Sequence, residues 1–387
     1  MRMLGRADRG LLGRWFWTVD KPLLALILVL ICVGLIAVAA ASPAAAQRLS
    51  GANFRLPELF FLWRQMMWVG LGLPVLLAVS LIPKDWVRRL AVIGTGLGIV
   101  LLAALPFIGA EVNGATRWIQ LGGFQLQPSE FLKPAFIVAT AWVLALRFDE
   151  PELPVYKVSI ALLAVIAGLL IIQPDYGQTL LIGAIWSAQA ILAGMSLVWV
   201  GGLVLAGIAL LVGGYFFSDH VSDRIDGFLF GAGDTYQADK ALDAIRSGGL
   251  LGTGPGQGEA KYSLPEPQTD YIFAVIGEEF GIIACIALAG LFLALVVRVL
   301  IQLTEEDDPF VTLAASGLAM QIGLQAFINM GVATSLLPSK GMTLPFISHG
   351  GSSFLALCVT AGMLLALTRR NRFLKASPFR GSGAVPA

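Results

Sequence analysis

The sequence predicts an all-α polytopic membrane protein with ten transmembrane helices, both termini in the cytoplasm and a large extracytoplasmic loop between helices 7 and 8. Of the 387 residues, 57% are hydrophobic and 13% are charged, a composition unlike that of a soluble domain. The hydrophobic residues gather in runs of about 20, the length at which a helix crosses the apolar core of a bilayer. Helices are expected because each closes its own backbone hydrogen bonds in lipid.

Ten apolar runs define the predicted spans. The first follows a basic segment and precedes small residues, as a secretory signal does, but its length favours a span. The spans cover approximately residues 21 to 42, 58 to 82, 87 to 109, 128 to 146, 156 to 173, 176 to 195, 197 to 217, 269 to 300, 309 to 335 and 350 to 368.

Lysines and arginines in the short loops predict the orientation, because such loops stay cytoplasmic. Most of these residues fall on one side when both termini are placed in the cytoplasm. Residues 1–20 are then an amino-terminal tail, residues 21–370 one membrane domain and residues 371–387 a disordered tail. The predicted extracytoplasmic segments are 43 to 57, 110 to 127, 218 to 268 and 336 to 349.

The largest outer segment contains a predicted amphipathic helix in DTYQADKALDAIRSGG. Asp234 and Gln237 have the spacing of a capping box, apolar residues recur at helical spacing, and Gly248 ends the pattern. We expect this helix to lie at the membrane interface. The following GGLLGTGPGQG lacks the Lys-Ser/Thr of a P-loop, so a flexible loop is favoured over a phosphate site.

Composition and spacing argue against other classes of function. The net charge of +1 provides no basic excess for nucleic acid. Cys32, Cys285 and Cys358 lie in apolar runs without pairing or metal-ligand spacing, so we expect small buried hydrophobic side chains. The acidic TEEDDP favours a solvated loop that ends at the helix-starting Pro309 over a metal site.

Ionisable groups at membrane depth are costly, so they are expected to be paired or functional. In NGATRWIQLGGFQLQPSEFLK, a glycine-rich outer loop runs into a helix that carries Glu130 and Lys133. The two residues are three apart and share a face, which predicts an internal ion pair. They could also hold an anionic ligand, and the two interpretations are compatible.

The motif QPDYG places Asp175 at an outer turn after a helix-breaking proline. An aspartate at this position is a typical helix N-cap. It could also pair with Lys133, in which case loss of either partner would leave an unpaired charge at membrane depth.

The segment SLPEPQTDYIFAVIGEEFG carries four carboxylates. Its prolines predict extended backbone before a helix, so Asp270 lies at the helix start and faces outward. Glu278 and Glu279 lie roughly 12 to 14 Å deeper, on different helix faces. We expect these two to be paired or packed, and Glu266 to be solvated or to anchor the loop.

The last outer segment, LLPSKGMTLPFISHGGSS, contributes three further candidates. Lys340 is suited to an anion such as a diphosphate. A structural hydrogen-bonding role is favoured for His349 over a catalytic one. Ser352 lies in the closing GGSS.

These four blocks, in this order, make the sequence similar to the SEDS family (shape, elongation, division and sporulation), polytopic glycosyltransferases that polymerise lipid II. The resemblance runs from the first span to the tenth. The blocks YQADKALDAIRSGGLLGTGPGQG and LLPSKGMTLPFIS resemble the division branch more than the elongation branch. Two positions depart from the family pattern, with His349 in place of tyrosine and Gln268 in place of the histidine of His-Thr-Asp, whereas Asp270 is intact.

The resemblance implies that the 4-hydroxyl of one lipid II attacks the anomeric carbon of an undecaprenyl-diphosphate-linked glycan during septal wall synthesis. A diphosphate leaves without an acid, so one base and several cations should suffice. Asp270 is the expected general base. The sequence contains no DxD motif, so it does not predict a metal site, although the diphosphate could recruit a divalent cation. The expected substrate-binding residues are Lys133, Glu130, Asp175, Lys340, Arg117, Arg246, Ser352 and His349.

The resemblance also implies partners: a class B penicillin-binding protein that acts as transpeptidase, bitopic division regulators and the lipid bilayer, with no nucleic acid. Two other functions stay open, a lipid II flippase and a non-catalytic division scaffold. A polar path to both faces would favour transport. An outer cluster of Asp270, Asp175 and Lys133 favours the enzyme.

Overall fold

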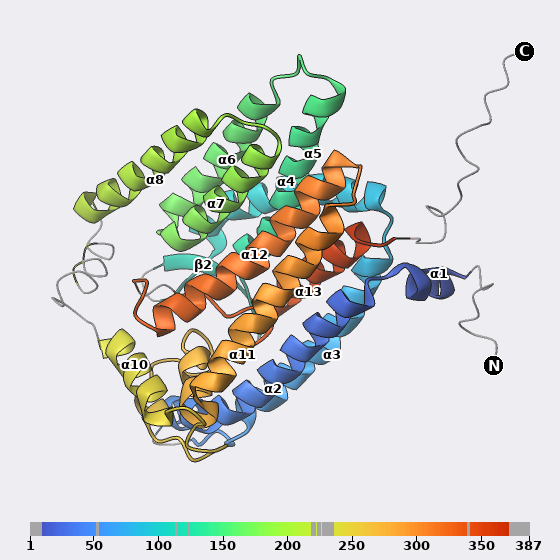
Figure 1. Ribbon diagram of the computed structural model, residues 1–387. Coiled ribbons are helices and arrows are strands. Elements are labelled where there is room, and N and C mark those ends of the chain that lie inside the picture. Colours follow the sequence, from blue (N-terminus) through green and yellow to red (C-terminus); the bar gives the residue numbers. More distant parts are fainter. Residues whose placement is uncertain are drawn as a thin grey trace, which may run out of the picture.

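The computed structural model describes residues 10–51, 54–112, 115–122, 124–217, 222, 226, 236–338 and 341–370. Long helices lie roughly parallel in one bundle (Figure 1). They are α2 (Lys21–Leu49), α3 (Phe60–Leu81), α4 (Lys84–Ile108), α5 (Pro128–Asp149), α6 (Val155–Ile172), α7 (Tyr176–Leu192), α8 (Leu197–Phe217), α11 (Ile272–Leu303), α12 (Pro309–Ala333) and α13 (Gly351–Leu367). Shorter helices are α1 (Leu11–Thr18), α10 (Tyr236–Gly248) and the 3₁₀ helix η1 (Ala260–Ser263).

Each predicted span overlaps one of these long helices, although α2 continues to Leu49, past the predicted end at residue 42. Within the described residues, seven helices are long and apolar enough to cross a membrane, namely α2, α3, α4, α5, α6, α11 and α12. Large apolar side chains such as Ile93, Val100 and Ile286 are exposed on their outer faces, as expected where lipid replaces water. The protein is therefore a polytopic membrane protein.

Most residues of α5 and α12 are buried, and these two helices pack against each other at the centre of the bundle. The close approach of α3 to α13 depends on a glycine. On α3, a Cβ at Gly72 would lie 2.6 Å from Phe354 and 2.7 Å from Cys358 of α13. Small residues at helix contacts are typical of membrane bundles. Cys285 and Cys358 are buried as predicted, but the prediction for Cys32 was wrong, because its side chain faces outward from α2.

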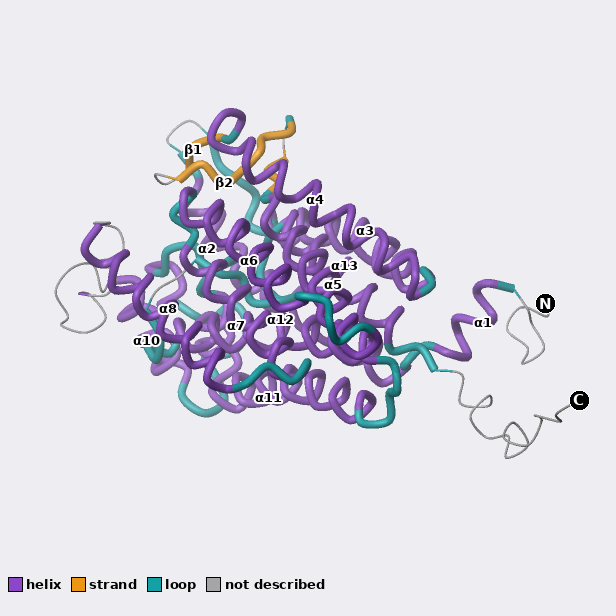
Figure 2. The backbone as a smooth tube through the Cα atoms, turned by 90° about the horizontal axis from the view of Figure 1, so that it is seen from above, coloured by secondary structure: helices purple, strands orange, loops and turns teal. Residues whose placement is uncertain are grey.

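A small antiparallel sheet occupies much of the segment predicted as a glycine-rich loop. Its strands are β1 (Ala110–Val112), β2 (Ala115–Leu121) and β3 (Phe124–Leu126), in that order. Strand β2 contains TRWIQL, whose β-branched and aromatic residues favour extended backbone. The strands lie at one edge of the bundle, and α1 projects on the other side (Figure 2). We call the end with the strands and the starts of α5, α11 and α13 the strand end.

The opposite end, where α4 and α12 begin, is called the Lys84 end and is held by ion pairs. Lys84 bonds to Asp308 at 2.6 Å, and Asp308 also caps α12. Asp20 pairs with Arg298 at 2.9 Å. The N–H of Arg370 donates to the Thr18 carbonyl at 3.0 Å, so the first and last described segments meet here.

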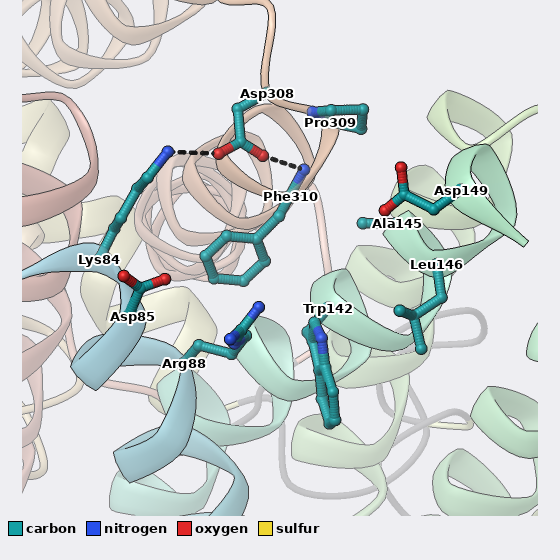
Figure 3. A pocket seen from close by; sticks show the side chains of 10 residues that line it. All are labelled: Lys84, Asp85, Arg88, Trp142, Ala145, Leu146, Asp149, Asp308, Pro309 and Phe310. Atoms are coloured by element: carbon teal, nitrogen blue, oxygen red, sulfur yellow. Dashed lines mark hydrogen bonds and ion pairs between the residues drawn. The ribbon is translucent and has the colours of Figure 1, made fainter.

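A cavity of about 130 Å³ lies beside the Lys84–Asp308 pair (Figure 3). The Arg88 guanidinium lies 5.5 Å from the ring centroid of Trp142 in its wall. The acidic TEEDDP segment thus ends in the paired Asp308 rather than in a wholly solvated loop, and α12 begins at Pro309 as predicted.

Helix α11 is not the uninterrupted span that the sequence predicts, because Gly281 has φ 81° and ψ 174° and breaks the helical path. The glycine-rich segment 249–258 packs against this break. The carbonyls of Glu278 and Glu279 accept hydrogen bonds from the N–H groups of Thr253 (2.9 Å) and Gly254 (3.1 Å). Backbone groups freed by the kink are thereby satisfied, as membrane depth requires.

The loop predicted at 249–258 is present, but it is packed and hydrogen-bonded against α11. At Gly252, where φ is 86°, a Cβ would lie 2.2 Å from the carbonyl oxygen of Glu279, so a side chain there would displace the segment. The glycines allow close backbone contact with α11. We call this segment the kink brace.

The deep carboxylates of α11 are buried and bonded within the protein, in agreement with the prediction that they are paired or packed. Glu279 forms a buried ion pair with Lys261, and the Lys261 ammonium also donates to the Ala40 carbonyl of α2 at 3.1 Å. Glu278 accepts from the N–H groups of Ala260 (2.6 Å) and Lys261 (2.8 Å). The predicted outer helix is α10, with Ala241 buried against α11 rather than facing lipid; Asp234 lies outside the described residues.

Replacing Lys261 by methionine should destabilise the protein by about 3–5 kcal/mol, because Glu279 would be left as an uncompensated buried charge. The matched control, Lys84→Met, removes a pair whose lysine side chain is 53% exposed and should cost less than about 1 kcal/mol. Unfolding in detergent measures both changes. Equal losses would contradict a structural role for the buried pair.

Candidate active site

A cavity of about 990 Å³ opens at the strand end, where α2 ends and α3, α5, α7, α11 and α13 begin. Its size is at the upper end of the range of small-molecule sites. The wall is built from segments that lie far apart in the sequence. The charged and polar side chains that line it include Arg48, Arg64, Arg117, Gln127, Glu130, Gln178, Glu266, Gln268, Thr269, Asp270, Thr343, His349, Ser352 and Ser353.

Asp270 lies on the wall at the entry to α11. Its side chain is half-buried, and its Oδ2 lies 3.2 Å from the position that a Cβ at Gly341 would occupy. The absence of a side chain at Gly341 thus leaves room beside the carboxylate. Glu266, four residues earlier, is exposed and accepts a hydrogen bond from the Thr269 hydroxyl at 2.8 Å, which makes it a loop anchor.

The predicted ion pair of Glu130 and Lys133 is present at 2.8 Å. Lys133 is fully buried and lies beneath the wall, with a second bond of 3.3 Å to Gln325 Oε1. Glu130 lines the cavity and also accepts a hydrogen bond from Gln178 Nε2 at 2.8 Å. Lys133 therefore acts on the cavity through Glu130, whose charge it balances.

The predicted contact of Asp175 with Lys133 was wrong. Asp175 instead caps α7, because its side chain accepts a hydrogen bond from the Gln178 N–H at 3.4 Å. The Lys133 ammonium is already directed at Glu130 and Gln325. The alternative prediction, an N-cap, is confirmed.

Arg117 projects from β2 and connects the sheet to the turn between α6 and α7. Its Nε donates to the Gln173 carbonyl at 2.9 Å and its Nη2 to the Pro174 carbonyl at 2.6 Å. Arg117 also lines the cavity, so a guanidinium held by backbone carbonyls contributes positive charge to the wall.

His349 is buried in the wall against α3. Its Nδ1 lies 3.0 Å from Gln65 Oε1, and its ring meets Phe61 edge to face at 5.2 Å. Burial, together with the nearby Arg64 cation, lowers the pKa of His349 to about 4. The imidazole is neutral near pH 7, which agrees with a structural hydrogen-bonding role.

The other predicted residues are placed differently. Ser352 lines the cavity, and its hydroxyl oxygen accepts a hydrogen bond from the Gln127 N–H at 3.4 Å. Arg246 is exposed on the last turn of α10 and does not line the cavity. Lys340 lies outside the described residues.

Comparison with known proteins assigns the fold to a family. The family model of the FtsW/RodA/SpoVE cell cycle proteins matches residues 21–373. The chain belongs to this family. The SEDS resemblance is thereby confirmed across all of the predicted membrane domain.

Relatives within the FtsW/RodA/SpoVE family support the division branch. The chain is 43% identical over 368 residues to the probable peptidoglycan glycosyltransferase FtsW of Caulobacter vibrioides, covering 94% of this chain and 93% of that protein. It is 36% identical to the corresponding FtsW of Coxiella burnetii, covering 91% and 96%.

Solved structures share the fold of this family member. One solved structure concerns the structural coordination of polymerization and crosslinking by a peptidoglycan synthase complex. It superposes with a TM-score of 0.72 at 26% identity, covering 90% of this chain and 97% of that one. The rod shape determining protein RodA of Thermus thermophilus has a TM-score of 0.67 at 28% identity, covering 90% and 96%.

Two cavity arginines were not among the predicted site residues. Arg48, on the last turn of α2, donates to the Leu264 carbonyl at 2.9 Å. Arg64, on the first turns of α3, is half-buried and lies 5.7 Å from the Phe60 ring, without a carboxylate partner among the described residues. The signal was available, because an arginine within an apolar span is presumed functional.

The described residues contain no group of three or more histidine, cysteine, aspartate or glutamate side chains placed to hold a metal ion. The cavity wall carries the half-buried carboxylate of Asp270, the charge-balanced carboxylate of Glu130, the exposed carboxylate of Glu266 and several guanidinium groups. Such a wall suits an anionic, hydroxyl-bearing ligand.

Replacing His349 by glutamine should make the free energy of unfolding depend less on pH below about 7. The folded protein has a His349 pKa of about 4, below the ordinary 6.5, so the unfolded chain binds the extra proton between these values. As pH falls from about 7 to about 4, the unmodified protein should lose up to about 3 kcal/mol more than the variant. Thermal unfolding in detergent at a series of pH values measures this, and parallel losses would contradict it.

Proposed function

We propose that the protein is a peptidoglycan glycosyltransferase that polymerises lipid II into glycan strands at the outer face of the cytoplasmic membrane during septal wall synthesis. The observation that carries this proposal is the strand-end cavity, which gathers Asp270, Glu130 and Arg117 from segments far apart in the chain. Relatives named as probable peptidoglycan glycosyltransferases support it over more than nine-tenths of the chain.

In the proposed reaction, Asp270 is the general base. It takes the proton of the 4-hydroxyl of one lipid II as that oxygen bonds to the anomeric carbon of the glycan chain. The bond from this carbon to the undecaprenyl diphosphate breaks, and the diphosphate leaves with the electron pair. Arg64 and Arg117 are placed to stabilise the developing negative charge. Glu130, balanced by Lys133, would orient the sugar hydroxyls.

We propose ten membrane crossings, with the Lys84 end in the cytoplasm and the strand end outside. The first and last described segments meet through Arg370 and Thr18, which supports an even number of crossings. Lys84, Arg88 and Arg298 lie toward this end, in agreement with the excess of basic residues on the cytoplasmic side. The segment 218–268 is then extracytoplasmic, and residues 1–9 and 371–387 lie outside the described part of the chain.

Transport of lipid II is less well supported than polymerisation. The strand-end cavity and the cavity at the Lys84 end share no lining residue among those described. Phe136, Ile137 and Trp186, at the centre of the bundle, are completely buried. A charged headgroup would have to displace this packed layer, whereas chemistry at the outer face needs no such path.

The proposed partners are a class B penicillin-binding protein, bitopic division regulators and the surrounding lipid bilayer. A solved relative belongs to a peptidoglycan synthase complex described as coordinating polymerization and crosslinking. A transpeptidase partner fits this chemistry, because newly made glycan must be crosslinked.

Asp270→Asn should abolish polymerisation, by on the order of 10²- to 10⁴-fold, because the amide cannot accept the hydroxyl proton. The purified variant is assayed with lipid II, with and without its transpeptidase. Glu259→Gln, the same change at an exposed carboxylate that does not line the cavity, is the control and should keep full activity. Normal glycan synthesis by the folded Asp270→Asn protein would remove Asp270 from the mechanism.

Arg64→Gln should lower kcat/KM for lipid II by about 10²-fold, because one cation facing the diphosphate is lost. Arg246→Gln, on the exposed face of α10 away from the cavity, should change it little. Initial rates over a range of lipid II concentrations distinguish the two. Similar losses in both variants would show that general surface charge, rather than the cavity, attracts the substrate.

A further inference from the structure

Three consecutive backbone carbonyls lead into α11, those of Gln268, Thr269 and Asp270. The backbone bonds at the start of this helix run from the Ala274 N–H to the Tyr271 carbonyl, at 3.0 Å. The three earlier carbonyls therefore depend on donors from elsewhere, since the helix does not orient them.

Each of these carbonyls accepts a hydrogen bond from outside α11. The first accepts from the backbone N–H of His349 at 2.8 Å. The second accepts from the Ser348 hydroxyl at 2.6 Å. The third, of Asp270 itself, accepts from Asn329 Nδ2 at 2.8 Å. We call this set of three donors the carbonyl clamp.

Asn329 is the member of the carbonyl clamp that joins two segments. It is 1% exposed on α12, and its side-chain amide also donates to the Met342 carbonyl at 2.7 Å. Met342 follows Gly341, the residue whose missing side chain leaves room for Asp270 Oδ2. One buried amide thus sets both the backbone of Asp270 and the segment that faces its carboxylate.

The segment 341–349, which faces the Asp270 carboxylate, is itself held by hydrogen bonds. Ser348 accepts a hydrogen bond from the Leu344 N–H at 2.8 Å while it donates to the Thr269 carbonyl. Gln325, one turn before Asn329 on α12, donates to the Thr343 carbonyl at 3.1 Å. Neither segment is free to move relative to α12, because side chains of that helix bind backbone carbonyls in both.

We propose that Asn329 is a positioning residue for Asp270, acting through the backbone and supported by Ser348. This inference rests on the proposed function, in which Asp270 is the base. Correct placement matters because a displacement of about 1 Å can reduce a rate by on the order of 10²-fold. Substrate affinity is set by other parts of the wall, so loss of the carbonyl clamp should reduce kcat and leave KM unchanged.

The experiment compares Asn329→Leu with Gln321→Met in the full-length protein. Both changes remove a buried amide from α12, but Gln321 makes no described bond to either segment. Asn329→Leu should lower kcat by on the order of 10²-fold at unchanged KM for lipid II. Hydrogen–deuterium exchange should rise in the peptides that cover 268–272 and 341–349. Gln321→Met should show neither change.

Unchanged exchange in Asn329→Leu would overturn the carbonyl clamp, and raised exchange with unchanged kcat would overturn its positioning role. If Asn329→Leu does not fold, Ser348→Ala should give the same two changes and Ser348→Thr, which keeps the hydroxyl, should restore kcat. Failure of the unmodified protein to make glycan from lipid II would instead overturn the proposed function, and full activity of Asp270→Asn would remove Asp270 from the mechanism. Either failure can be told apart from failure of the carbonyl clamp, because the exchange measurement does not depend on the identity of the base.

Discussion

The buried ion pair between Glu130 and Lys133 is the interaction on which the cavity depends. Lys133 is fully buried on α5, so its charge must be balanced inside the protein. The network extends from this pair to Gln178 of α7, Gln325 of α12 and Ser353 of α13. Four helices therefore meet in one set of polar contacts. The same contacts hold a carboxylate at the cavity wall while apolar side chains face lipid.

A second buried pair, Lys261 with Glu279, stabilises the kink of α11. Without the kink brace, the break at Gly281 would leave backbone groups unsatisfied at membrane depth. With it, the outer part of α11 can adopt its own direction and carry Asp270 to the cavity. The backbone of α11 thus joins the buried, ion-paired Glu279 to Asp270, the proposed base at the start of the helix.

Much of the bundle could be predicted because the relevant signals are local. Apolar run length predicted a helix in each span, and the spacing of Glu130 and Lys133 predicted their pairing. The sheet over 110–126 was missed because glycines masked its strand pattern. The kink at Gly281 was missed because an apolar helix and a broken one have the same composition.

The sequence by itself determined that the chain crosses a membrane many times, which family it resembles, and that Asp270 lies at the start of a helix. Only the tertiary structure decided which side chains share the cavity with Asp270. It placed Arg64 and Arg117 in the wall and left Arg246 outside it. The physical reason is that spacing along one helix sets local neighbours, whereas contacts between distant segments depend on how the helices pack.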